Sequence, residues 1–272
     1  MKKILSVLLT IVVILTVSGC GTKKEVPATA KIVPEKKTIK VGASPMPHSE
    51  ILEVVKPLLA KDGYTLEIVE FTDYVTPNTA LAEGQLDANF FQHVPYLQTF
   101  SKEKNLDLDY TVKVHIEPMG VYSSKYKDLN DLKAGAEIAI PSDPTNGARA
   151  LRVLENAGLL KLKSGELISK LDITQNSKQL KITELDAPQL PRILKDVDAA
   201  VINSNFAIEA NLNPTVDSLA IEAKDSPYAN VLAVKSEDKT KDYIKALSKA
   251  LNSPEVKKFI EDKYKGNVIP AF

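Results

Sequence analysis

The chain has 272 residues, of which 44% are hydrophobic and 26% are charged, as is ordinary for a globular protein of one large or two smaller domains. Its 35 basic and 35 acidic residues give a formal net charge of zero, so it lacks the positive excess that nucleic-acid-binding proteins carry. Cys20 is the single cysteine, which excludes a disulfide within the chain.

The N-terminal residues have the pattern of a bacterial lipoprotein signal. A short basic start precedes the apolar run Ile4–Val17, whose length of about 14 residues is too short to cross a ~30 Å hydrocarbon core as a helix. Small residues then lead to Cys20, as at a signal cleavage site. We predict that residues 1–19 are a signal peptide and that Cys20 is lipidated. An ordinary cleaved signal and an uncleaved membrane anchor are the alternatives.

A polar segment follows the predicted lipidation site. Residues 20–38 are rich in Lys, Glu, Pro, Thr and Ala and show no apolar period, which predicts a disordered tether. As a flexible coil, such a segment of about 18 residues would reach roughly 24 Å. A tether of this length would keep a globular domain near a membrane.

From Ile39 onward, predicted strands and helices alternate along the chain. The expected strands are residues 39–43, 64–71, 88–91, 137–140, 182–185, 199–202 and 231–234, with an extended segment at 108–121. The expected helices are residues 48–60, 78–83, 93–104, 145–157, 189–194, 204–211, 242–252 and 254–263. This alternation predicts an α/β fold, and the number of elements favours two sheets over one. Ligands in such folds bind beyond the carboxyl ends of strands.

One such strand end contains an arginine close to a helix start. Asp143 or Ser142 can cap the helix that begins there, and Pro144 suits its first turn. Arg149 lies about one turn into this helix, where a guanidinium beside a helix N-terminus favours a carboxylate. A surface salt bridge is the alternative role for Arg149.

A second strand end is rich in aromatic residues. Phe90 and Phe91 point to opposite faces of a strand, so we expect one in the core and the other facing a cleft. His93 and Tyr96, together with Tyr74 from another strand end, would complete a partly apolar slot that suits a thioether. A core histidine with one hydrogen bond is the alternative for His93.

Two asparagines and a search for enzyme motifs complete the candidates. Asn203 and Asn230 stand at strand boundaries, where an amide can accept from an ammonium or donate to a carboxylate, although asparagine also favours turns. The sequence has no phosphate-binding loop and no HExxH or GxSxG motif, and His48, His93 and His115 lack helical metal-ligand spacing. We therefore predict no catalytic site, no metal site and no cofactor.

Several segments together resemble the NlpA/MetQ-type lipoproteins, the methionine-binding receptors of ABC importers. The matching segments occur in the family's order at residues 41–51, 70–74, 87–97, 117–120, 141–151 and 225–230. Ser44–Met46 departs from the Thr-Pro-Gly run that is more usual in the family, so Met46 would reshape the edge of the cleft.

The resemblance implies a two-lobed type II periplasmic-binding-protein fold, each lobe a mixed sheet flanked by helices. Lobe 1 would comprise residues 39–118 and 230–272, and lobe 2 residues 119–229. Arg149 would hold the ligand's carboxylate, Asn203 and Asn230 would hold its amino and carboxylate groups, and the aromatic slot would enclose its side chain. The ligand-binding residues that the resemblance implies are Tyr74, Phe91, His93, Tyr96, Asn146, Arg149, Asn203 and Asn230.

The implied function is that of a membrane-tethered, extracytoplasmic receptor without enzymatic activity. It would bind methionine and deliver it to an ABC permease and its ATPase, with a lipid anchor at Cys20 and no nucleic-acid partner. A methionine-containing dipeptide or another apolar amino acid is the nearest alternative ligand. A metal receptor that uses His48, His93 and His115, or an exported enzyme, would be an alternative of another class.

Overall fold

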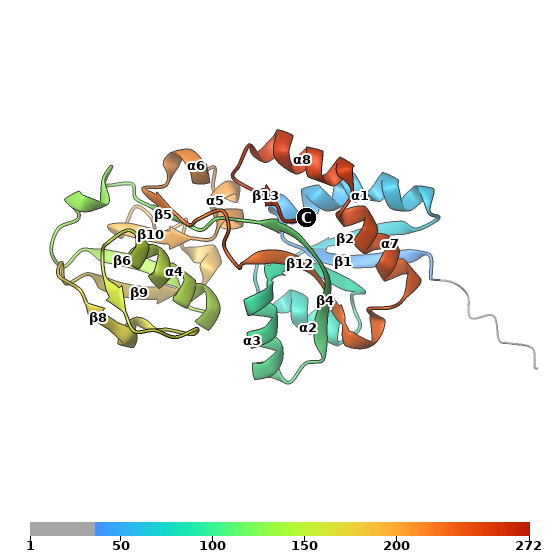
Figure 1. Ribbon diagram of the computed structural model, residues 1–272, viewed down its shortest axis with the longest axis horizontal. Helices are drawn as coiled ribbons and strands as arrows, with labels where there is room; N and C mark the ends of the chain where they lie inside the picture. The colour runs from blue at the N-terminus through green and yellow to red at the C-terminus, as the bar shows by residue number, and fades with distance from the viewer. Residues whose placement is uncertain (1–35) are drawn as a thin grey trace, which may run out of the picture. The chain divides into compact units, whose positions relative to one another are not determined.

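The computed structural model describes residues 36–272, so the predicted signal peptide, Cys20 and most of the predicted tether lie outside the described residues. The described residues form two large mixed sheets and a short two-stranded ribbon. Helices pack against both large sheets (Figure 1). Within residues 36–272, no helix combines the length and the apolar character needed to span a bilayer.

The larger sheet has six strands in the order β13-β4-β12-β3-β1-β2. β1 pairs in parallel with β2 and β3, whereas β12 runs antiparallel to β3 and β4, and β13 runs antiparallel to β4. The bounds are β1 (Thr38–Ala43), β2 (Thr65–Glu70), β3 (Ala88–His93), β4 (Leu108–Ile116), β12 (Ala229–Lys235) and β13 (Ile269–Pro270).

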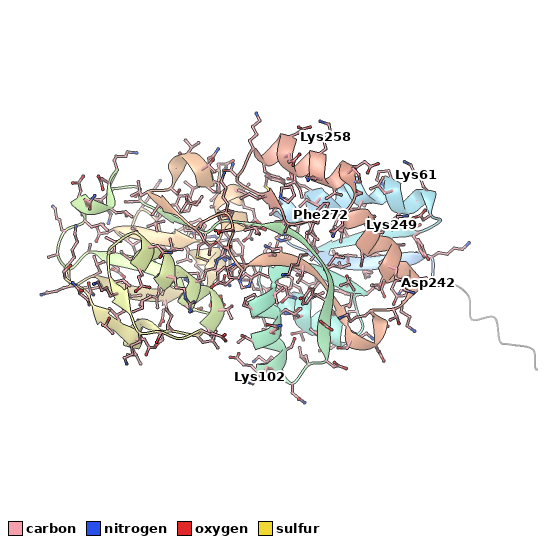
Figure 2. All side chains as sticks on the ribbon, in the orientation of Figure 1. Lys61, Lys102, Asp242, Lys249, Lys258 and Phe272 are labelled. Atoms are coloured by element: carbon pink, nitrogen blue, oxygen red, sulfur yellow. The ribbon has the colours of Figure 1, made fainter. Side chains whose placement is uncertain are left out.

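Helices cover both faces of this sheet: α1, α7 and α8 lie on one face, and α2 and α3 lie on the other (Figure 1). On α1, Ile51, Val55 and Leu59 recur about once per turn and are fully buried against the sheet. Charged side chains such as Lys61 and Lys249 project from the outer surface of these helices (Figure 2). The bounds are α1 (Glu50–Lys61), α2 (Thr76–Ala82), α3 (Val94–Lys104), α7 (Asp242–Leu251) and α8 (Pro254–Tyr264).

The smaller sheet has five strands in the order β11-β5-β10-β6-β9. β10, β6 and β9 run parallel, and β5 runs antiparallel to β10 and β11. Ile138 and Ile140 of this sheet share a buried core with Leu151 and Leu154 of α4. The bounds are β5 (Gly120–Tyr122), β6 (Glu137–Pro141), α4 (Pro144–Asn156), β7 (Lys161–Leu162), β8 (Ile173–Gln175), β9 (Lys181–Leu185), β10 (Ala199–Ile202), α5 (Ser204–Glu209), α6 (Pro214–Asp217) and β11 (Ala220–Ile221).

The backbone passes from the larger sheet to the smaller one between β4 and β5 and returns between β11 and β12. The first crossing contains Glu117, Pro118 and Met119, and the second contains residues 222–228. The lobe boundaries at residues 118–119 and 229–230 stay a prediction, because strand pairing alone does not show which residues move together.

The α/β class and most of the predicted elements are confirmed. The predicted helix over residues 189–194 is wrong: the segment has a 3₁₀ turn at Ala187–Gln189 followed by irregular turns. Pro188 and Pro191 have no backbone N–H to donate, and Arg192 donates three residues back, to Gln189 O at 3.0 Å. The strands β7, β8, β11 and β13 were missed because pieces of two or three residues carry no periodic pattern.

Candidate functional site

A cavity lies where residues from both sheets meet. Its volume is about 20 Å³, which is room for about one water molecule. The walls therefore lie close together, and a small-molecule ligand must part them to be accommodated. The lining residues are Tyr74, Phe91, Gln92, His93, Tyr96, Glu117, Asn146, Arg149, Asn203, Ser204, Asn205 and Asn230.

All eight ligand-binding residues that the sequence suggested line this one cavity. Their location is observed, whereas their contact with a ligand stays a prediction. Gln92, Glu117, Ser204 and Asn205 also line the cavity and were not predicted. Met46, which we expected at the cleft edge, is not among the lining residues.

The first turn of α4 supplies one wall. Asp143, one of the two caps considered, accepts a hydrogen bond from the Asn146 backbone N–H at 2.9 Å, and Pro144 follows in the first turn as predicted. Gly147 lets the helix approach β6, because a Cβ atom there would lie 3.0 Å from the Pro141 carbonyl oxygen. The Asp143 carboxylate also accepts from the Asn146 side chain at 3.0 and 3.2 Å, which fixes that amide's orientation.

His93 links the larger sheet to this helix. Its Nδ1 atom accepts the Tyr96 backbone N–H at 3.1 Å and caps α3, so the ring proton lies on Nε2. Nε2 then donates to Asn146 Oδ1 at 3.1 Å, and the same oxygen accepts from the Asn203 amide at 2.8 Å. Burial, reinforced by the Arg149 charge, lowers the pKa of His93 to about 3, so the ring is neutral at physiological pH.

Aromatic rings form the apolar part of the wall. Phe90 is fully buried in the core while Phe91 lines the cavity, as the strand alternation predicted. The Tyr74 ring lies 5.9 Å from both Phe91 and Tyr96, and its hydroxyl donates to Asn205 Oδ1 at 2.5 Å. Burial raises the pKa of Tyr74 and Tyr96, so both phenols stay neutral donors. The slot is therefore uncharged and aromatic.

Arg149 is only 3% exposed, so the surface salt bridge that we considered for it is wrong. Its Nε and Nη2 atoms donate to the two carboxylate oxygens of Glu222 at 3.0 and 2.5 Å, and Nη2 also donates to the Glu117 carbonyl oxygen at 2.7 Å. The guanidinium carbon stacks 4.3 Å from the centre of the Tyr228 ring. These contacts hold the guanidinium in the cavity wall, within reach of an anion.

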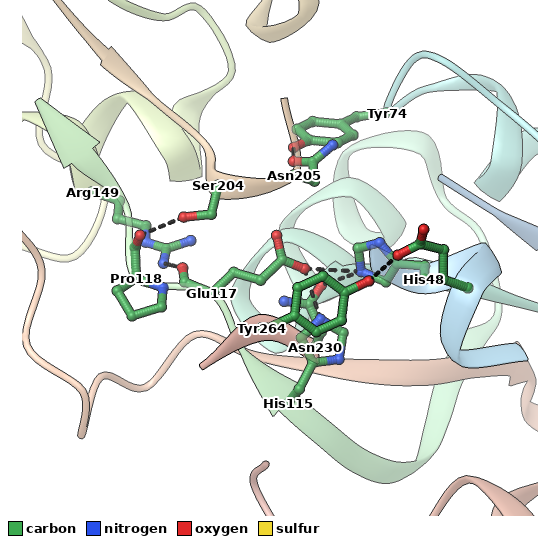
Figure 3. A network of polar contacts seen from close by, with 11 residues as sticks. His48, Tyr74, His115, Glu117, Pro118, Arg149, Ser204, Asn205, Asn230 and Tyr264 are labelled. Carbon is green, nitrogen blue, oxygen red and sulfur yellow. Dashed lines mark hydrogen bonds and ion pairs between the residues drawn. The ribbon is translucent and has the colours of Figure 1, made fainter. Parts of the chain in front are cut away.

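A second buried cluster surrounds Glu117 (Figure 3). Its Oε1 atom lies 2.7 Å from His115 Nε2 and 3.2 Å from His48 Nε2, and His48 Nε2 lies 3.1 Å from Asn230 Oδ1. Burial lowers the pKa of His48 to about 4 and that of His115 to about 3, while burial raises the pKa of Glu117. The cluster reaches the cavity through Glu117 and Asn230.

The sequence offered only weak signals for these additional residues. Among the described residues, the one group of at least three side chains that brings metal-ligating atoms within 4.8 Å of one another comprises His48, His115 and Glu117, and His93 is not part of it. These three are far apart in sequence or lack helical spacing, so no motif search finds them. Glu222 lies in the second crossing, where an isolated acidic residue looks like any surface carboxylate.

Known proteins are similar to this chain along nearly all of its described residues. Residues 39–272 match the family described as NlpA lipoprotein. A solved nutrient-binding protein from Burkholderia cenocepacia bound to methionine is 49% identical, with a TM-score of 0.84 over 86% of this chain and all of that chain. The methionine-binding lipoprotein MetQ of Bacillus subtilis is 40% identical over 247 residues, which cover 87% of this chain and 89% of that protein. The D-methionine-binding lipoprotein MetQ of Salmonella typhi is 38% identical over 264 residues, or 95% and 94% of the two chains. The two-lobed binding-protein fold class is thereby confirmed.

Proposed function

Because the chain belongs to the NlpA lipoprotein family, we propose that it is a membrane-tethered receptor that captures methionine between two lobes and hands it to an ABC permease. Relatives carry the names of methionine-binding lipoproteins, and a structural neighbour was solved with methionine bound. The observation that carries the proposal is the convergence of a buried guanidinium, amides and neutral aromatic rings on one cavity between the two sheets.

The chemistry of the walls suits an amino acid with a thioether. Arg149 would bind the carboxylate, and the Asn203 and Asn230 amides would bind the amino and carboxylate groups. Tyr74, Phe91 and the neighbouring rings would enclose the side chain, since aromatic edges and sulfur attract one another. His93 and Asn146 would keep the two walls in register, because they hydrogen-bond to each other across the cavity.

The energies are adequate for such a ligand. Burial of about 100 Å² of thioether side chain contributes ~2.5 kcal/mol. Each charge-assisted hydrogen bond to the carboxylate or the ammonium adds roughly 1.5–3 kcal/mol. Lobe closure and ligand ordering offset part of this gain. A micromolar Kd needs about 8 kcal/mol, which the sum can reach.

The membrane partners are part of the same proposal. Cys20 would carry the lipid anchor, and the protein would face the outside of the cytoplasmic membrane beside its permease and ATPase. Supporting this, the relatives are named lipoproteins. The protein would make and break no covalent bond in its ligand.

Mass spectrometry of the small molecule released by denaturing the purified protein tests the ligand. We expect methionine at close to one equivalent per chain. Release of a methionine-containing dipeptide or another apolar amino acid would keep the receptor but replace its ligand. Release of a metal ion, with no amino acid binding on titration, would contradict the proposal.

A further inference from the structure

Glu117 is the one carboxylate among the residues that line the cavity. It lies in the first crossing between the sheets, and it is 6% exposed. A buried carboxylate is costly unless it is paired or strongly hydrogen-bonded, so its presence in a ligand cavity calls for a physical reason. The predicted ligand contacts gave it no role.

The hydrogen bonds around Glu117 favour its ionised form. The Nδ1 atom of His115 is buried and has no hydrogen-bond partner within residues 36–272, and the Nε2 atom of His48 lies 3.1 Å from the Asn230 amide oxygen, which can only accept. A buried Nδ1–H without an acceptor would cost more than an Nδ1 lone pair without a donor, and the Asn230 amide oxygen needs a donor. Each neutral ring therefore carries its proton on Nε2. Both Nε2 atoms lie within 3.2 Å of Glu117 Oε1. Glu117 Oε1 therefore accepts these hydrogen bonds, which favour the ionised carboxylate and oppose the effect of burial on its pKa.

The neighbouring charges leave this anion without a cation of its own. Arg149 is the one cation among the lining residues, and the bidentate contact with Glu222 already matches its charge. The two imidazoles that contact Glu117 are neutral, because burial lowers the pKa of both. Arg149, the partly buried Glu222 and an ionised Glu117 thus carry one net negative charge beside the cavity, which favours a ligand with a positive group.

We infer that Glu117 is the counter-charge for the ligand's α-ammonium group and that His48 and His115 position its carboxylate. This inference rests on the proposed function and deepens it. The site would then require a free ammonium as well as a carboxylate. Desamino and N-acylated forms of methionine, and dipeptides in which methionine is the second residue, would leave Glu117 buried without a cation.

A metal ion at the same atoms fits the donor set less well. Coordination would use the Nε2 lone pairs of His48 and His115 and would move their protons to Nδ1. A ligating histidine normally donates its other N–H to a carboxylate or a carbonyl. The Nδ1 atom of His115 has no acceptor among the described residues. The geometry therefore suits a hydrogen-bonded carboxylate.

The test compares methionine with 4-(methylthio)butanoate, which keeps the carboxylate and the thioether but lacks the amine. Titration calorimetry on the wild-type protein, E117Q and E53Q gives the affinity ratio of the two ligands. We expect E117Q to weaken methionine binding about 100-fold or more, since a buried charge pair loses one partner, and to change butanoate binding less than about 3-fold. E53Q is the matched control, because Glu53 is an exposed carboxylate that pairs with Lys56 on α1 and does not line the cavity, and it should keep the wild-type preference for methionine.

The outcomes distinguish a failure of this inference from a failure of the proposed function. Failure of the wild type to bind methionine would overturn the function itself. Equal losses for both ligands in E117Q, or no loss for either, would overturn the role of Glu117. Titrations at pH 7 in buffers of different ionisation enthalpy add a measurement on the wild type that needs no variant. Near-zero proton release on methionine binding supports an ionised Glu117, whereas release of about one proton would show that Glu117 is protonated in the free protein. Zinc-dependent stabilisation that is lost in E117Q would refute the inference, because it would show a metal site at these atoms.

Discussion

The Nε2 atom of His93 lies 3.1 Å from the Oδ1 atom of Asn146. This hydrogen bond joins the end of β3 in the larger sheet to the first turn of α4 beside the smaller sheet. Asn203 donates to the same oxygen at 2.8 Å, so one amide oxygen ties together side chains from three elements of the cavity wall. Because the cavity between them is narrow, a ligand can enter only if contacts of this kind open.

The arginine in the wall should matter more for binding than the histidine that links the walls. Arg149→Ala should weaken methionine binding about 100-fold or more, because the ligand's carboxylate would be buried without its cation. His93→Ala should cost about 10-fold, because it removes hydrogen bonds between neutral groups. Titration calorimetry measures both values.

Arg152→Ala is the matched control for the arginine variant, because Arg152 lies on the same helix and donates to the carbonyl oxygens of residues 165 and 166 instead. It should change the affinity by less than about 3-fold. A larger loss in His93→Ala than in Arg149→Ala would mean that the pocket assignment is wrong.

The aromatic slot should discriminate against oxidised methionine. Methionine sulfoxide has the same head group, but its polar S=O would be buried against the rings of Tyr74, Phe91 and Tyr96. Burial of a polar group without a hydrogen bond costs about 1–3 kcal/mol in proteins, so the sulfoxide should bind at least about 10-fold more weakly. Competition against labelled methionine checks this, and equal competition would show that the side chain lies elsewhere.

Stability should fall in mild acid because of the buried histidines. Burial lowers the pKa of His93 to about 3, so between pH 6.5 and 4 the unfolded chain binds a proton there and the folded chain does not. The free energy of unfolding therefore decreases as the pH falls below 6.5. This single group contributes up to about 1.4 kcal/mol per pH unit once the unfolded histidine is protonated.

Glu209 acts in the opposite direction, because burial raises its pKa to about 7, and it offsets part of this loss. A comparison of wild type with His93→Gln isolates the histidine. Urea unfolding at several values between pH 7 and pH 4.5 should give a shallower pH dependence for the variant. Parallel curves for the two proteins would show that His93 does not titrate as its burial indicates.

The lipid anchor can be tested without reference to the ligand. In cells that express the full chain, Cys20→Ala should shift the protein from the membrane fraction to the soluble fraction after lysis, and metabolic labelling with palmitate should be lost. Cys20→Ser would serve as a second variant that keeps the side-chain size. Membrane retention of both variants would contradict anchoring at Cys20.

Much of the fold could be predicted because its elements are long and periodic. The stripe of Ile51, Val55 and Leu59 on α1 and the apolar run of β10 specify their structure locally. Residues 189–194 have the apolar spacing of a helix, but Pro191 within them, and Pro188 just before them, have no N–H to donate. Short edge pairs such as β13 with β4 depend on tertiary contact and leave no local signal.

The candidate site likewise has residues that the sequence indicated and residues that it did not. Arg149 and the aromatic residues stand at strand ends or helix starts, where the rule for α/β folds directs attention, and the resemblance added Asn146. Glu117 and its histidines are brought together from separate elements, and the bond between Arg149 and Glu222 spans 73 residues of sequence. Such pairings depend on how the crossings fold, so spacing along the chain could not reveal them.

The central claim is that this cavity binds methionine by its charged head group and its thioether. Titration of L-methionine into protein that has been unfolded, dialysed and refolded to remove any bound ligand tests it most directly. We predict one site per chain with a micromolar or tighter Kd, abolished in Arg149→Ala. Absence of binding to the refolded wild type, or unchanged binding in the variant, would contradict it.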